Sequence, residues 1–186
     1  MPALRRLGLV AVLAALFAAG PLAADQKDKR LAPLFAELAA AKSPAEGDAL
    51  SDRIWQIWLE APDARAAALL AEGITAMNGA AYDTALAAFD KLVVAAPDFA
   101  EGWNRRATLL YMMDDLNGSV RDIEHVLALE PRHFGALSGL GLIYMKLGDD
   151  EAALKAFRRA LAIDPYLAGD KENVQTLEKR LKDHAI

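Results

Sequence analysis

Two pairs of adjacent carboxylates are the residues whose type and spacing could carry chemistry in this chain of 186 residues. Asp114-Asp115 and Asp149-Asp150 could serve as paired acids and bases. Three histidines, His125, His133 and His184, could bind a metal ion. They are scattered along the chain without the spacing typical of metal ligands, so no metal site is predicted.

Nothing else in the sequence favours catalysis. There is no Gly-rich phosphate loop, nucleophile elbow or His-Glu metal motif. The chain has no cysteine, which excludes disulfides, thiolate metal sites and cysteine nucleophiles. Its formal net charge of −5 argues against a nucleic-acid partner, because neutralising phosphates needs an excess of Lys and Arg. We therefore predict a protein that is not an enzyme and carries no cofactor.

The elements that must position these residues are visible in residues 133–165, HFGALSGLGLIYMKLGDDEAALKAFRRALAIDP. This stretch contains, in order, Leu137-x2-Leu140-Gly141-x2-Tyr144, Ala153-x3-Phe157 and Pro165. It resembles the tetratricopeptide (TPR) repeat, a helix–turn–helix unit of about 34 residues, with Leu137 in place of the leading Trp. The resemblance implies an all-α, right-handed solenoid that acts as an interaction scaffold.

The same period extends toward the N-terminus. Pro97, Pro131 and Pro165 are separated by 34 residues each, which predicts three repeats at 66–99, 100–133 and 134–167. Each proline should end the second helix of its unit, because proline cannot continue the hydrogen-bond ladder. Both aspartate pairs fall where a unit turns between its helices. Turns and helix N-caps are therefore their expected role.

Residues 1–24 have the layout of a secretory signal peptide. Arg5 and Arg6 precede an uninterrupted apolar run from Leu7 to Ala19, and Leu22-Ala23-Ala24 offers a cleavage site before Asp25. The apolar run is short for a membrane anchor, which needs about 20 residues. The arginine pair also weakly resembles a twin-arginine signal, but no cofactor site requires export of a folded chain. We therefore expect cleavage, a periplasmic location and no membrane insertion of the mature protein.

The segments on either side of the repeats are also predicted to be helical. Residues 25–65 should form a pair of helices, at about 31–41 and 44–60, with Ser43 as an N-cap and Pro44 in the first turn. We interpret this pair as a degenerate repeat. Residues 168–186 should form a capping helix whose Val174, Leu177 and Leu181 make one narrow apolar stripe.

Tryptophans and arginine pairs offer further candidates for binding. Trp103 occupies a packing position of the repeat and is expected in the core. We also predict that Trp55 and Trp58 lie in the core. The alternative is that they form an interface between protomers. The pairs Arg105-Arg106 and Arg158-Arg159 have acidic neighbours and are interpreted as solvated faces.

The family resemblance also implies a binding surface, since the first helix of each unit lines a concave groove. Carried over position by position, the groove comprises Ala67, Leu70, Ile74, Met77 and Asn78; Glu101, Asn104, Thr108, Tyr111 and Met112; and Gly135, Ser138, Leu142, Met145 and Lys146. Flexible methionines and a tyrosine suit an adaptable apolar surface. We expect the Asn104 side chain to lie in water, where it can bind a peptide. The alternative is a groove filled by the chain's own N-terminal segment.

One established use of this fold is not expected here. Co-chaperones of the family grip terminal carboxylates with Lys, Arg and Asn side chains. Asn104 matches one such position, but Leu70, Ile74, Gly135 and Gly139 replace the others. The favoured reading is a periplasmic adaptor that binds a protein or peptide of unknown identity. The rival is a homo-oligomeric envelope protein joined through Trp55 and Trp58 or through the capping helix.

Overall fold

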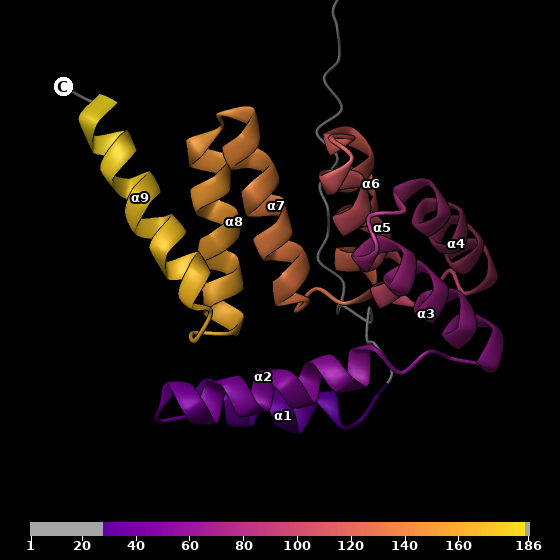
Figure 1. The fold of residues 1–186 in the computed structure, drawn as a ribbon. Helices are drawn as coiled ribbons and strands as arrows, with labels where there is room; N and C mark the ends of the chain where they lie inside the picture. The colour runs from indigo at the N-terminus through magenta and orange to yellow at the C-terminus, as the bar shows by residue number, and fades with distance from the viewer. Residues whose placement is uncertain (1–27, 185–186) are drawn as a thin grey trace, which may run out of the picture.

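The computed structural model describes residues 28–184, so the predicted signal peptide lies outside the described part of the chain. That part is all-α, as predicted, and its helices are α1 (Leu31–Ala40), α2 (Pro44–Trp58), α3 (Ala64–Asn78), α4 (Tyr82–Ala95), α5 (Ala100–Met112), α6 (Leu116–Leu129), α7 (Phe134–Leu147), α8 (Asp150–Ile163) and α9 (Ala168–His184). Helices α3 to α8 pack as three antiparallel pairs, which follow one another as a right-handed α-solenoid (Figure 1).

Small residues let the two helices of a unit approach closely. A Cβ atom added to Gly73 would lie 2.3 Å from the Phe89 ring, and one added to Gly141 would lie 2.6 Å from the Phe157 ring. In the middle unit, the Ser119 hydroxyl donates a hydrogen bond of 2.8 Å to the Ala107 carbonyl. Small residues at these positions therefore allow the two helices of a unit to pack closely.

The aspartates between helices are caps, as predicted. Asp115 accepts a hydrogen bond from the Gly118 backbone N–H, and Asp149 accepts one from Ala152, which satisfies first-turn donors of α6 and α8. The second helices α4, α6 and α8 each end two residues before a proline. Within residues 28–184, no group of His, Asp and Glu side chains could hold a metal ion.

The N-terminal pair, α1 and α2, lies across the ends of α7, α8 and α9 (Figure 1). Its core residues, among them Leu31, Leu38 and Ile54, share one apolar cluster with Phe134 and Leu137 of the third repeat. Polar contacts strengthen this docking. Ser51 donates to Asp164 at 2.6 Å, and the Tyr166 hydroxyl donates to the Ala41 carbonyl at 2.5 Å. The pair therefore packs on the third repeat, which is remote from it in the sequence.

Helix α9 covers the other side of the third repeat. Leu177 is fully buried, and Val174 and Leu181 pack beside it against Phe157 and Tyr144. The apolar stripe predicted from the sequence is thus the docking face of this helix. None of the helices in the described chain is long and apolar enough to cross a membrane.

Candidate partner-binding groove

The predicted groove residues are exposed, partly buried or buried, and their exposure differs between the two halves of the first helices. Apart from Ala67, Gly135 and Ser138, which lie in first halves, the accessible residues lie in the second halves of α3, α5 and α7. Those exposed to solvent are Ala67, Asn78, Thr108, Met112, Leu142 and Lys146, and those partly buried are Ile74, Met77, Tyr111, Gly135, Ser138 and Met145. Leu70, Glu101 and Asn104 are buried. We call the accessible residues of the second halves the open groove.

Large apolar side chains are exposed at the open groove. In the described chain, Met112 is 46% exposed, Leu142 39% and Leu147 58%, and all three lie in the second halves of α5 and α7. Val94, on the second helix α4, is the other large hydrophobic residue exposed in residues 28–184. Met112 and Leu142 belong to the open groove, and Leu147 is a further exposed residue of α7. Large apolar side chains that remain in water favour contact with a partner.

Lys146 links the second and third units beside this surface. Its ammonium group forms an ion pair of 2.6 Å with Asp114 and lies 5.1 Å from the centre of the Tyr111 ring. The hydrogen bond to Asp114 raises the pKa of Lys146 above its ordinary value. Lys146 therefore stays charged at neutral pH, with part of its hydrogen-bonding capacity already used by the chain itself.

The other end of the groove is closed by α2. The ring of Trp58 is fully buried and stacks on His133, with ring centres 4.1 Å apart and planes 9° apart. Trp55 covers Gly135, where an added Cβ atom would lie 2.6 Å from its ring. The core role favoured for both tryptophans is correct, and filling of the groove by the chain itself holds for this end.

Glu101 and Asn104 lie inside this closed end, against expectation. Glu101 has no exposed surface and receives hydrogen bonds or ion pairs from three groups: Asn104 Nδ2 at 2.9 Å, Arg105 Nε at 2.6 Å and His133 Nε2 at 3.3 Å. His133 Nδ1 accepts the Ala136 N–H, so Nε2 carries the proton that faces Glu101. A buried carboxylate needs such partners to offset its loss of hydration.

The expectation that the Asn104 side chain lies in water was therefore wrong. Asn104 is 8% exposed, and its side-chain amide is bound to the buried Glu101, which also contacts His133 in the loop before α7. Leu70 is likewise a core residue, 6% exposed, in a cluster with Phe89 and Phe99. Neither side chain is free to bind a partner.

Ser138 is held by the capping helix. Its hydroxyl donates to Asp170 Oδ2, in the first turn of α9. Burial raises the pKa of the Asp170 carboxyl, an effect that the hydrogen bond from Ser138 partly offsets. Ser138 thus fastens α9 to α7 and does not belong to the open groove.

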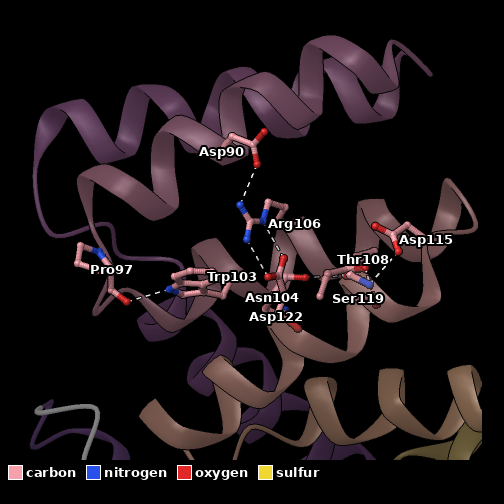
Figure 2. Close-up of polar contacts among 11 residues, drawn as sticks. Asp90, Pro97, Trp103, Asn104, Arg106, Thr108, Asp115, Ser119 and Asp122 are labelled. Atoms are coloured by element: carbon pink, nitrogen blue, oxygen red, sulfur yellow. Dashed lines mark hydrogen bonds and ion pairs between the residues drawn. The ribbon is translucent and has the colours of Figure 1, made fainter.

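Arg105 and Arg106 are structural residues, which corrects their interpretation as a solvated face. Arg106 makes a two-pronged ion pair with Asp122 at 2.7 and 2.8 Å and a single contact of 2.8 Å with Asp90 (Figure 2). These contacts raise the pKa of Arg106, chiefly through the hydrogen bonds to Asp122. Arg106 therefore joins α5 to α6 and α4. Trp103 packs beside it, and its Nε1–H donates to the Pro97 carbonyl at 2.8 Å.

Comparison with known proteins agrees with this geometry. The family model for the tetratricopeptide repeat matches residues 135–167. A TPR repeat-containing protein of Rhizobium etli is 36% identical over 159 residues, which cover 86% of this chain and 78% of that protein. The chain belongs to the tetratricopeptide repeat family. Proteins of this family are generally non-catalytic adaptors, which agrees with the absence of catalytic motifs from the sequence.

Solved structures with the same fold include TPR domains with bound peptides. The TPR domain of Sgt2 from Aspergillus fumigatus matches with a TM-score of 0.63 at 20% identity, over 67% of this chain and 84% of that one. The first TPR domain of Spaghetti (RPAP3), bound to an HSP90 peptide, matches with a TM-score of 0.62 at 20% identity, over 66% of this chain and 97% of that one. At this identity the likeness shows the fold alone.

Proposed function

We propose that this TPR protein is an exported, periplasmic adaptor that binds a peptide segment of a partner protein in the open groove. The observation that carries the proposal is the exposure of Met112, Leu142 and Leu147 along two neighbouring first helices. A domain of the same fold was solved with an HSP90 peptide bound to it, which supports peptide binding as the mode of action.

The proposed ligand is a short segment with an apolar side chain. Met112 and Leu142 would contact that side chain, since flexible and apolar surfaces adapt to varied partners. Asn78 and Thr108 lie among the exposed residues and offer hydrogen bonds to a peptide backbone. The peptide has to stop short of Gly135, because Trp55 occupies that position.

Capture from the native envelope tests this function. Met112→Ala and Leu142→Ala should each weaken capture of the bound partner by roughly 5- to 150-fold, the range expected for a contact at the centre of an interface. Val94→Ala is the control, because it removes an even more exposed apolar side chain, 82% exposed, from the second helix of a unit. Capture that survives both groove substitutions, or falls equally with the control, would overturn the proposal.

The periplasmic location rests on the sequence of residues 1–24. Cell fractionation with N-terminal sequencing tests it, and the mature chain should begin at Asp25. Recovery from the cytoplasm with Met1 intact would contradict export.

Assembly through the tryptophans, one of the two modes of the rival function, is not supported by their contacts. Trp58 has no exposed surface, and Trp55 packs edge-on against Trp58 and Phe134 of its own chain. A partner could reach these rings only if α2 left the third repeat.

A further inference from the structure

A cleft with a volume of about 370 Å³ runs between α8 and α9, outside the open groove. Leu154, Ala162 and Leu181 supply its apolar surface. Basic side chains of α8 stand beside them, although the chain as a whole has a net charge of −5. One acidic residue, Glu151, also lines the cleft beside three basic residues, so the cleft combines an apolar floor with a net positive local charge.

Two of these cations have no partner within residues 28–184. Arg158 forms an ion pair of 2.7 Å with Glu178 of α9. Lys155 and Arg159, in contrast, are exposed and form no ion pair or side-chain hydrogen bond with another described residue. They lie four residues apart, which places them on one face of α8, about 6 Å apart along its axis.

The outer face of α2 has the complementary pattern. Asp48 and Asp52 are exposed, lie four residues apart and make no ion pair with the described chain. The exposed Ala45 and Ala49 adjoin them on the same helix and would permit close approach of an apolar surface. The opposite face of α2 is buried against its own third repeat through Ile54 and Trp58. Asp48 and Asp52 therefore lie on the solvent-exposed face of α2.

We propose that the α8–α9 cleft binds α2 of a second copy of this chain. Asp48 and Asp52 of one copy face Lys155 and Arg159 of the other, and the alanines of α2 cover the apolar floor. The equal spacing of the two charge pairs sets the register, since each acidic residue then meets one basic residue. Two different faces meet, so the contact is heterologous and can extend into chains. The proposal is independent of peptide binding in the open groove.

Sedimentation velocity of the mature protein over a range of concentrations tests this contact. We expect reversible association at roughly 0.05 M salt that weakens strongly at about 0.5 M, because exposed charges are screened. The variants Asp48→Lys/Asp52→Lys and Lys155→Glu/Arg159→Glu should each raise the dissociation constant at least about tenfold, since each places like charges opposite one another. All four positions are exposed on helices, so the circular dichroism spectrum should not change.

Mixing the two variants tests directly whether the two faces bind each other. The unchanged cleft of the first variant accepts the unchanged α2 of the second, and the basic α2 of the first variant faces the acidic cleft of the second. The mixture should therefore associate in alternating copies, as the unmodified protein does, although each variant alone does not. A chain with all four substitutions should associate with itself again. Met112→Ala, in the open groove, serves as the control and should associate like the unmodified protein. A protein that is monomeric at all concentrations, association that survives both charge reversals, or variants that do not combine would each overturn the proposal.

Discussion

The first helices α5 and α7 present two different ends to their surroundings. In their second halves, Met112, Leu142 and Lys146 remain in contact with water. In their first halves, Glu101 and Gly135 are covered by α2 or by the loop that it packs against. Equivalent positions of a repeat can therefore be binding surface or core, and the difference comes from an element outside the repeats.

The largest effect is expected from Trp58→Ala at the closed end. The substitution empties a fully buried site between α1, α2 and the third repeat, and such changes cost about 3–5 kcal/mol. Urea unfolding followed by circular dichroism measures the loss. A loss below about 1 kcal/mol would show that α2 does not depend on this contact.

Two glycines of α7 sharpen the comparison within one helix. Gly135→Ala should destabilise the protein by about 1–3 kcal/mol, because the new Cβ atom would collide with the Trp55 ring at 2.6 Å. Gly139→Ala is the control. Its Cβ atom would meet nothing closer than 3.6 Å, and alanine favours the helix by up to about 1 kcal/mol. The melting temperatures of the two variants should shift in opposite directions. Equal shifts would contradict the finding that Trp55 covers Gly135.

Asn104 and Thr108 compare the two ends of α5. Asn104→Ala removes a donor to the buried Glu101 carboxylate, so a loss of about 1–3 kcal/mol is expected. Thr108→Ala removes an exposed hydroxyl that donates one local hydrogen bond of 3.0 Å to the Asn104 carbonyl, and it should change stability by less than about 0.5 kcal/mol. Urea unfolding followed by circular dichroism measures the stability of both variants. Equal stability of the two variants would mean that the Asn104 side chain contributes no more to the free energy of unfolding than the Thr108 side chain does.

The smallest effect on stability is expected at the open groove itself. Met112→Ala and Leu142→Ala should each change the free energy of unfolding by less than about 0.5 kcal/mol, because water already reaches these side chains. Chemical unfolding of the purified variants checks this. A loss above about 1.5 kcal/mol for either variant would show that the open groove is also core.

Much of the fold could be predicted because its signals are local. The regular prolines, the small residues at Gly73 and Gly141 and the aspartate caps all act within one unit of about 34 residues. The accessible groove residues followed from the same register. Glu101 and Asn104 were misplaced because family positions describe a groove without a cover. Leu70 was misplaced because it packs with Phe89 and Phe99.

The sequence by itself determined that the chain repeats a helix–turn–helix unit and that a proline follows the second helix of each unit. Only the tertiary structure decided that Trp58 meets His133, 75 residues further along the chain, and that Glu101 is thereby buried. Short-range periodicity specifies contacts between neighbours. The docking of α2 depends on the combined shape and polarity of surfaces that exist only after the repeats have stacked, so no spacing within the chain could announce it.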